Sequence, residues 1–330
     1  MNNTTLKKIA ETLGCSISTV SRALKHHPDI SVKTREKVLE LAQTLDYEPN
    51  AFAVHLRTQN SKVIGLMVPF IYNQFYESFI ASVEEESRKH GFALMILQTA
   101  NDPAIEAENL KLFRQNRVMG LFACITANTT DFNGFRKMGE QNIPVVYFDN
   151  VPKDANTYRV CLADERAATL AAEAILQSGK KNIAALFGDP GLSITTNRKE
   201  AMESFFQSKS PAVNLTSYHA VNSKEAETIV QQILKAPQKP EVIFCMSDEL
   251  LIGAMKAVQQ LELKIPEQIG VISISNGFIP QLYHPCITYI ETSGYKLGKL
   301  AFTHMMACIS GASAVKELVQ DAVLIKGGSL

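Results

Sequence analysis

The sequence lacks the marks of an exported, membrane-spanning or metal-binding protein. It contains no run of about 18 apolar residues, which a membrane-spanning helix needs, and residues 1–10 are too polar for a signal peptide. The six cysteines are scattered, with no C-x-x-C pair and no histidine at metal-ligand spacing. We therefore expect a cytoplasmic protein with reduced cysteines that mostly lie in the core, without a disulfide framework and without a metal site.

The motifs of several enzyme classes are also missing. The sequence contains no G-x-G-x-x-G, no G-x-x-x-x-G-K-[ST], no G-x-S-x-G and no H-E-x-x-H. The glycine-rich stretch 188–191 includes Pro190, which lacks one of the amides that a phosphate-binding loop would use. We therefore expect no catalytic residue and no cofactor, although an enzyme remains the main alternative from another functional class.

The chain has no overall excess of charge, but its charges are unevenly distributed. Lys plus Arg and Asp plus Glu number 33 each. Residues 1–62 hold nine basic and six acidic residues, net +3, so the remainder is net −3. A small basic segment attached to a slightly acidic body predicts a protein that contacts phosphates with one end only.

Three short helices are predicted in the basic segment. The first has apolar residues at helical spacing up to Leu13, and Gly14 ends it. Ser16 is a good N-cap for a second helix, and Ser31 for a third that runs to Leu45. Two helices joined by a tight glycine turn and followed by a third form a helix-turn-helix unit. A structural cap on a larger enzyme is the alternative interpretation.

The second helix has one apolar and one polar face. Val20, Ala23 and Leu24 face inward. The outward face consists of Ile17, Ser18, Ser21, Arg22 and Lys25. Short polar side chains allow close approach to the major groove, where Arg can pair with guanine and an aliphatic group can meet a thymine methyl. This pattern predicts that the helix binds duplex DNA.

A short hinge helix is predicted next. Asn50 can cap a brief helix over 51–57, whose apolar residues Ala53 and Leu56 have no local core to join. An exposed leucine on such a helix is suited to insertion between base steps in the minor groove. A plain linker is the alternative.

From Lys62 onward, apolar runs alternate with amphipathic stretches. Strands are expected at 63–68, 93–97, 120–125, 145–148, 183–188, 213–219, 242–246 and 270–275. Helices are expected at 75–90, 104–116, 132–141, 167–178, 198–209, 224–235 and 249–261. Continuously apolar strands that alternate with helices predict parallel sheets covered on both faces, and two such series predict two doubly wound lobes.

Ligands of such sheets bind beyond the carboxyl ends of the strands. The loops at those ends combine one arginine with carboxylates, amides and aromatic rings, which suits a polar molecule with several hydroxyls. They cover 70–76, 149–150, 189–198, 247–248 and 275–276. A helix cap is the alternative role for an isolated aspartate there, and Asp248 is the clearest instance.

The ordered motifs of the chain resemble the lactose-repressor (LacI/GalR) family. The likeness is carried by Thr5–Ala10, Ser18–Leu24, Pro28–Ser31, Thr34–Val38, Tyr47–Ala51 and Leu56–Thr58. The resemblance implies base contacts by Ile17, Ser18 and Arg22, backbone contacts by Ser16, Ser21, Thr34 and Asn50, and a hinge wedge formed by Leu56. The full DNA-binding set that we predict is Thr5, Ser16, Ile17, Ser18, Ser21, Arg22, Thr34, Asn50, Ala53, Leu56 and Arg57.

The resemblance also implies the domain organisation. An all-α helix-turn-helix head (1–48) and a hinge helix (49–60) would precede a two-lobed α/β core like that of periplasmic binding proteins (61–330). The first lobe would comprise about 61–160 and 292–320, and the second about 161–291 and 321–330. The segment 284–290 resembles the family's crossing back to the first lobe, with a helix at 298–309 and a strand at 322–325 after it. No leucine heptad follows, so we expect no tetramerising tail.

Effector-binding residues are implied in the same way. They are Asn73, Phe75, Tyr76, Asp149, Arg198, Ser247, Asp248, Ser275 and Asn276. Two departures from the family pattern stand out, since Ser247 replaces the Asn of a typical Asn-Asp pair and Ser275-Asn276 replaces a typical Asp-Asp pair. Ser and Asn can still bond sugar hydroxyls without a charge.

These observations together predict a transcriptional regulator, most simply a repressor. We expect it to bind a palindromic operator in double-stranded DNA as a homodimer, because a symmetric protein needs a symmetric site. A small polar effector, a sugar or sugar derivative, would bind between the lobes, change their angle and so control the hinge helices. The protein would be cytoplasmic, away from membranes, and nucleoid-associated when bound to its operator. A cytoplasmic binding protein or an enzyme on the same core is the alternative.

Overall fold

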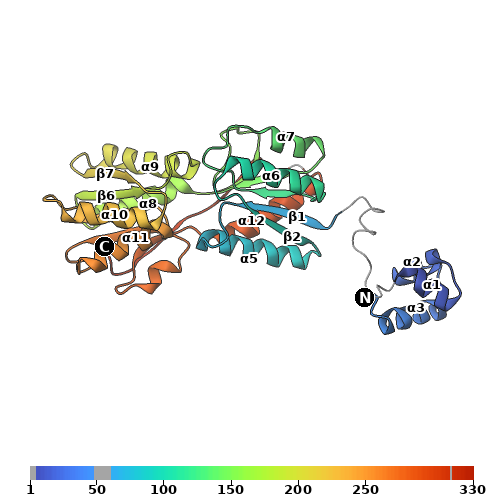
Figure 1. The fold of residues 1–330 in the computed structure, drawn as a ribbon. Helices are drawn as coiled ribbons and strands as arrows, with labels where there is room; N and C mark the ends of the chain where they lie inside the picture. The colour runs from blue at the N-terminus through green and yellow to red at the C-terminus, as the bar shows by residue number, and fades with distance from the viewer. Residues whose placement is uncertain (1–4, 48–60, 313) are drawn as a thin grey trace. The chain divides into compact units, whose positions relative to one another are not determined.

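The computed structural model describes residues 5–47, 61–312 and 314–330 of the chain. It divides into two compact units, Met1–Ser61 and Lys62–Leu330, which are described separately below (Figure 1). The predicted DNA-binding residues Asn50, Ala53, Leu56 and Arg57 lie outside the described residues.

Across the described residues 5–47, the first unit contains three helices, as predicted. They are α1 (Leu6–Leu13), α2 (Ile17–Leu24) and α3 (Val32–Thr44). The side chains of Thr5, Ser16 and Ser31 each accept a hydrogen bond from the third backbone N–H of the helix that follows. Gly14 ends α1 with φ 62°, a left-handed conformation that favours glycine. The apolar faces meet in one small core of Ile9, Ala10, Val20, Ala23, Val38 and Ala42.

The first lobe of the second unit is built on a fully parallel sheet. Its strands, in spatial order, are β11 (Glu317–Gln320), β5 (Tyr158–Leu162), β4 (Val145–Phe148), β3 (Leu121–Ala123), β1 (Val63–Val68) and β2 (Ala93–Gln98). Successive strand residues point to opposite faces, so Leu66 and Met67 join different cores. One core packs against α5 (Gln74–Lys89) and α12 (Gly294–Ile309), and the other against α6 (Pro103–Gln115) and α7 (Asn133–Glu140).

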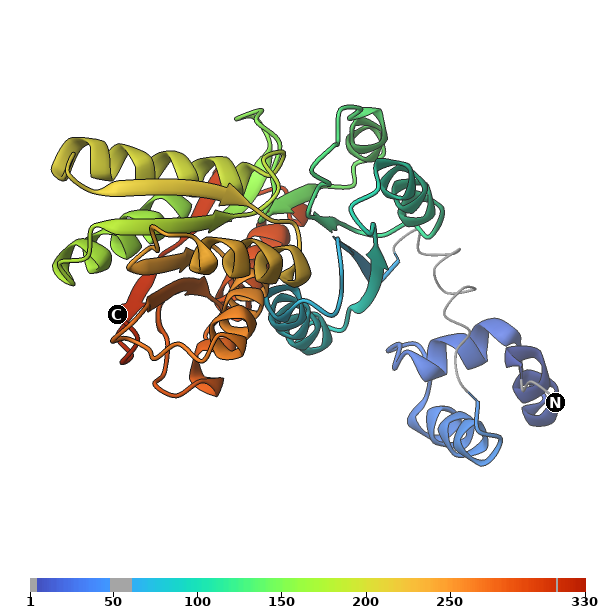
Figure 2. The same cartoon turned by 60° about the vertical axis from the view of Figure 1, so that its left-hand side comes forward.

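The second lobe has a sheet of the same size with one antiparallel edge. Its strands, in spatial order, are β12 (Val323–Ile325), β10 (Thr288–Glu291), β9 (Gly270–Ser275), β8 (Val242–Cys245), β6 (Asn182–Phe187) and β7 (Asn214–His219), with only β12 antiparallel to its neighbour. Its helices are α8 (Asp164–Gln177), α9 (Ser193–Lys209), α10 (Ser223–Lys235), α11 (Asp248–Gln260) and the short 3-10 helix η1 (Ile279–Leu282). Figure 2 shows these helices on both faces of the sheet.

The doubly wound fold is as predicted, but several boundaries differ. The strands β5 and β11 were not predicted, and they pair with each other in the first sheet. Because β5 ends at Leu162, the first segment of the first lobe continues past its expected end near residue 160. The alternating polar and apolar residues of these two strands, typical of half-covered strands, lack the continuous apolar pattern on which the prediction relied. The segment expected to cross between lobes at 284–290 ends in β10 of the second sheet, so the crossing follows Glu291.

Three local features bear on function. No helix among the described residues is long and apolar enough to cross a membrane. Within the same residues, no group of three or more His, Cys, Asp or Glu side chains could hold a metal ion. All six cysteines are free thiols, of which Cys124 and Cys245 are buried and Cys286 is exposed.

Candidate DNA-binding surface and inter-lobe pocket

The helix α2 has the outward face that the sequence predicted. Ile17, Ser18 and Arg22 are exposed, while Val20 and Ala23 are buried against the other helices. Ile17 retains 48% of its exposure, which is high for a large aliphatic side chain in so small a unit. The face therefore offers a guanidinium group, a short hydroxyl and an aliphatic group side by side, which is the set of groups that base edges in the major groove can bind.

Hydroxyl groups gather at the amino ends of α2 and α3. The Ser16 hydroxyl lies 2.8 Å from those of both Ser18 and Thr19, and Ser31 lies 2.8 Å from Thr34. The same Ser16 and Ser31 oxygens accept backbone N–H groups and so fix the start of each helix. Helix amino ends carry partial positive charge, so these hydroxyls and N–H groups suit contact with DNA phosphates.

All nine predicted effector-binding residues line one small pocket in the second unit. Asn73, Phe75, Tyr76 and Asp149 come from the first lobe, and Arg198, Ser247, Asp248, Ser275 and Asn276 from the second. The pocket has a volume of about 80 Å³, and Leu162, Met246, Ile274 and Thr292 complete its lining. This space holds two or three waters at about 30 Å³ each, so a sugar needs either a wider separation of the lobes or access to neighbouring space.

Asp149 is the acidic group on the first-lobe side of this pocket. It is 6% exposed and has a left-handed backbone, φ 59°. The Tyr76 hydroxyl donates to its Oδ2 over 2.6 Å, and the Cys124 thiol donates to the same oxygen over 3.8 Å. Burial raises the pKa of Asp149, although the Tyr76 hydrogen bond and the Arg198 charge oppose the rise. Its other oxygen remains available to a ligand hydroxyl.

Arg198 is largely committed to protein partners. Its Nε and Nη2 lie 2.7 Å from Oδ1 of Asp164, and Nη1 donates to the carbonyl of Met246 over 2.7 Å. Both charged side chains are 5% exposed. Burial raises the pKa of Asp164 to about 6, and Arg198 opposes that rise. The guanidinium charge is therefore neutralised before any ligand binds.

On the second-lobe side, Asp248 is held by its neighbours. Ser275 donates its hydroxyl to Oδ1, and the backbone N–H of Asn276 donates to Oδ2 over 2.9 Å. Burial raises the pKa of Asp248, and these two hydrogen bonds oppose the rise. Ser247, not Asp248, is the N-cap of α11, since its hydroxyl oxygen accepts the N–H of Leu250. Asp248 is thus left to line the pocket.

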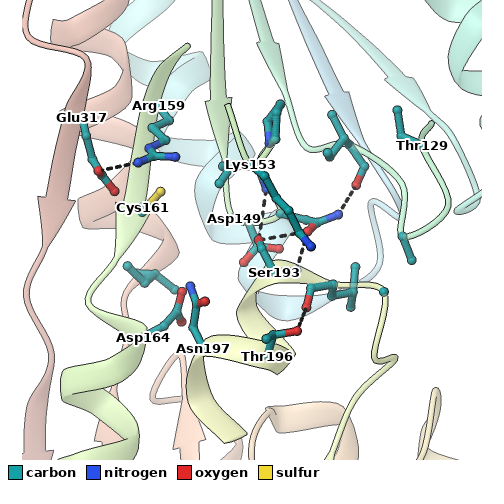
Figure 3. Close-up of a pocket in the computed structure, with 18 of the residues that line it drawn as sticks. Thr129, Asp149, Lys153, Arg159, Cys161, Asp164, Ser193, Thr196, Asn197 and Glu317 are labelled. Carbon is teal, nitrogen blue, oxygen red and sulfur yellow. Dashed lines mark hydrogen bonds and ion pairs between the residues drawn. The ribbon is translucent and has the colours of Figure 1, made fainter. Parts of the chain in front are cut away.

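A larger cavity of about 980 Å³ lies beside the small pocket and shares Asp149 and Leu162 with it. Figure 3 shows the Arg159 and Glu317 ion pair at one side of the cavity, and Asp149 and Ser193 near the middle of the view. Asn150 connects the lobes here, because its Oδ1 accepts hydrogen bonds from the backbone N–H of Ser193 over 2.8 Å and from its hydroxyl over 3.0 Å.

One wall of the cavity is supported from behind by Glu106. This side chain is 3% exposed, and its two oxygens accept the Thr126 N–H over 3.0 Å and the Thr129 hydroxyl over 2.8 Å. Burial raises the pKa of Glu106, while both hydrogen bonds lower it. Glu106 therefore holds in place the turn that follows β3.

Asn150 and Ser193 fall in predicted ligand-binding loops but were not chosen as effector-binding residues, and Asp164 was not predicted to lie near the ligand. Asp164 was missed because β5 was not predicted, although it follows that strand as Asp248 follows β8. Ser193 was placed in a loop because α9 was expected to begin at Arg198, whereas it begins at Ser193. The position of Asn150, next to Asp149 after β4, was a signal that could have been used.

Comparison with known families supplies the context for this geometry. The profile described as "Bacterial regulatory proteins, lacI family" matches residues 5–50. The profile described as "Periplasmic binding proteins and sugar binding domain of LacI family" matches residues 61–326, most of the chain. This chain belongs to the LacI family. The first profile thus covers the three described helices, and the second covers the two-lobed core.

Several named transcriptional repressors are similar to this chain over nearly their whole length. The HTH-type transcriptional repressor PurR of Histophilus somni (strain 2336) is 26% identical over 318 residues, covering 96% of this chain and 95% of the relative. The ribose operon repressor of Halalkalibacterium halodurans is 26% identical over 298 residues, 90% and 88% of the two chains. The sucrose operon repressor of Pediococcus pentosaceus is 26% identical over 330 residues, 98% of each.

Solved structures share the fold. The Lac repressor dimer bound to operator and the anti-inducer ONPF superposes with a TM-score of 0.89 at 20% identity, covering 99% of each chain. A LacI transcriptional regulator from Alkaliphilus metalliredigens complexed with D-xylulofuranose gives a TM-score of 0.71 at 22% identity, covering 82% of this chain and all of that one.

Proposed function

We propose that this chain is a repressor that binds a palindromic operator as a homodimer and whose operator affinity is set by an uncharged polyhydroxy ligand in the inter-lobe pocket. The observation that supports the proposal is the convergence of nine side chains from both lobes on one pocket, in a chain whose first unit exposes a helix face suited to contact base edges. A ligand held by both lobes stabilises one lobe arrangement over others, which is the requirement for control of a second site.

The charges of the small pocket argue for an uncharged ligand. Asp149 and Asp248 present carboxylates, and Arg198 is the only cation among the described residues that line the pocket. Because Arg198 is paired with Asp164, an anionic group inside the small pocket would face two carboxylates without a free positive charge. Carboxylates accept hydrogen bonds from hydroxyl groups, so a sugar or other polyol fits this arrangement.

The pocket size favours a ligand that reaches the larger cavity. Since the two spaces meet at Asp149 and Leu162, one molecule can bond Asp149 and extend toward Asn150 and Ser193. The names of relatives point to sugars of different sizes, ribose and sucrose. We propose a carbohydrate ligand and no catalytic role, because the carboxylates, amides and hydroxyls around the pocket are suited to hydrogen-bond sugar hydroxyls.

A homodimer is supported by exposed apolar side chains on the second unit. They include Ile71, Tyr72, Ile252, Phe278 and Leu282, of which Tyr72 is 73% exposed and Leu282 62%. The Asn276 side chain donates a hydrogen bond to the carbonyl of Gln74, so the segment before Phe278 lies beside the segment after Tyr72. The helix η1, which contains Leu282, contacts α11, which contains Ile252. A surface of this kind suits a second copy of the chain. We place the protein in the cytoplasm, where its DNA target lies.

The experiment that tests this proposal selects DNA sites from a random duplex pool at fixed salt. The selection is repeated with D-ribose, D-xylulose and sucrose as probes of three sizes. We expect a palindromic sequence to be enriched, and one probe to change its recovery. Failure to enrich any sequence would refute the repressor function. An enriched palindrome that responds only to anionic sugar phosphates, tested in parallel, would refute the uncharged ligand.

A further inference from the structure

Asn276 belongs to the second lobe, but its side chain bonds the first. It follows β9, and its Oδ1 accepts the backbone N–H of Gly294 over 2.9 Å, at the start of α12. The same oxygen lies 3.1 Å from the hydroxyl of Ser78, and Nδ2 donates to the carbonyl of Gln74 over 3.4 Å, both on α5. Each polar atom of the side chain is therefore used within the protein.

The place where this side chain binds is sterically tight. A Cβ atom at Gly294 would lie 2.4 Å from the carbonyl oxygen of Phe75 and 2.5 Å from Oγ of Ser78. Only glycine lets the start of α12 approach α5 so closely. Asn276 thus bonds both helices at the point where they meet, and a shift of either helix would break its hydrogen bonds.

The backbone of Asn276 is connected to the ligand pocket. Its N–H donates to Oδ2 of Asp248 over 2.9 Å, and Ser275 occupies the other carboxylate oxygen. Asp248 lines the small pocket. A ligand hydroxyl that donates to Oδ2 of Asp248 would share this acceptor with the N–H of Asn276, so occupancy of the pocket would act on the loop that carries the side chain.

We propose that Asn276 is a positioning residue that ties the second lobe to α5 and α12 and transmits occupancy of Asp248 to the first lobe. It does not select the ligand. The expected effect on DNA binding rests on the proposed function. The tie itself, which is the set of hydrogen bonds from the Asn276 side chain to α5 and α12, does not. An amide is required because it both accepts from Gly294 and donates to Gln74, and a carboxylate can only accept.

The tie is tested first by hydrogen exchange on the full-length protein without ligand. In Asn276→Ala, the amide of Gly294 should exchange about fivefold faster or more, since its acceptor is removed. Asn276→Asp keeps an acceptor oxygen at this position, so the Gly294 amide should exchange as slowly as in the unaltered protein. The matched control Gln281→Ala removes a hydrogen bond to the Gly277 carbonyl in the same loop and should leave Gly294 unchanged. Equal Gly294 exchange in Asn276→Ala and the unaltered protein would overturn the tie.

Its transmission role is tested by a double-mutant cycle at the enriched operator. Asn276→Ala and Ser78→Ala should each shift the operator Kd by about fivefold or more in the same direction. The double variant should shift the operator Kd no further than Asn276→Ala alone, because that change already removes the contact between Asn276 and Ser78. Gln281→Ala should stay within about twofold. Additive shifts, or an unchanged Kd in Asn276→Ala, would overturn the inference. If the unaltered protein binds no operator, the proposed function fails. The hydrogen-exchange experiment would still show whether Asn276 bonds the amide of Gly294.

Discussion

Arg198 of α9 and Asp164 of α8 form a buried ion pair in which two guanidinium nitrogens each lie 2.7 Å from the same carboxylate oxygen. A third nitrogen of Arg198 donates to the carbonyl of Met246, which follows β8. The pair thus joins the ends of two helices and a strand where they border the inter-lobe pocket. Burial of such charges is costly, and the contact is tolerated because each charge has its partner.

The first prediction concerns this pair. Arg198→Gln leaves the Asp164 carboxylate buried without its cation, so the free energy of unfolding should fall by about 3–5 kcal/mol. Urea denaturation followed by circular dichroism measures the change. The double variant Arg198→Leu with Asp164→Leu removes both charges and should recover most of the loss. A single variant within about 1 kcal/mol of the unaltered protein would contradict a structural role for the pair.

A second prediction concerns pH and the first lobe. His304 on α12 is 3% exposed, its Nε2 has no hydrogen-bond partner among the described residues, and its ring packs against Tyr158. Burial lowers the pKa of His304 below its ordinary value of 6.5. The unfolded chain therefore binds a proton more readily than the folded protein as the pH falls below 6.5. The contribution of neutral His304 to the free energy of unfolding is thus present above pH 6.5 and is lost as the pH falls below it.

Thermal or urea unfolding between pH 5 and 7.5 checks this dependence. His304→Phe keeps a ring against Tyr158 but removes the titrating group. The decline of stability at acid pH should be smaller in this variant than in the unaltered protein. Identical pH profiles for the two proteins would show that His304 does not titrate in the expected sense.

The fold was largely predictable from the sequence because its strongest signals are local. Gly14, Ser16 and Ser31 mark helix ends, and the structure places them at those ends. The buried central strands, such as 63–68 and 270–275, are continuously apolar and were identified within a residue or so. The nine predicted effector-binding residues could be named because the carboxyl ends of parallel strands converge and because the resemblance to the LacI/GalR family marks positions in those loops.

The features that were missed depend on contacts distant in sequence. The strands β5 and β11 are separated by more than half the second unit, and a salt bridge between Arg159 and Glu317 helps to hold them side by side. No local pattern indicates that pairing. The role of Asn276 is another example, since its partners Ser78 and Gly294 belong to other elements. A position in a loop at the end of a strand predicts that a residue lies near a ligand. It does not predict which of that residue's polar atoms are already hydrogen-bonded within the protein.

A third prediction separates base recognition from phosphate contact on α2. Arg22→Ala should weaken binding to the enriched operator by about 10- to 100-fold and reduce discrimination against changed bases, because a guanidinium that pairs with guanine is lost. Lys25→Ala should weaken binding to all sequences alike and reduce the salt dependence by about one released counterion. Fluorescence anisotropy at several salt concentrations distinguishes the two effects. If both variants behave identically, α2 does not read bases.

A fourth prediction concerns assembly. Leu282 is 62% exposed next to Phe278 on the proposed dimer surface, so Leu282→Glu would bury a charge in the interface. Sedimentation velocity should show this variant shifted from dimer to monomer at concentrations where the unaltered protein is a dimer. Val323, which is 50% exposed on β12, provides a control, and Val323→Glu should remain dimeric. The reverse pattern would move the interface to the β12 edge.

The most direct test of the account is the operator Kd measured against ligand concentration in the unaltered protein and in Asp149→Ala. The ligand is whichever of D-ribose, D-xylulose or sucrose altered site recovery. We predict that this sugar shifts the operator Kd of the unaltered protein by about fivefold or more, and that Asp149→Ala binds operator alone within about twofold of normal but loses the shift. A full ligand-induced shift in Asp149→Ala would contradict control of DNA binding from the inter-lobe pocket.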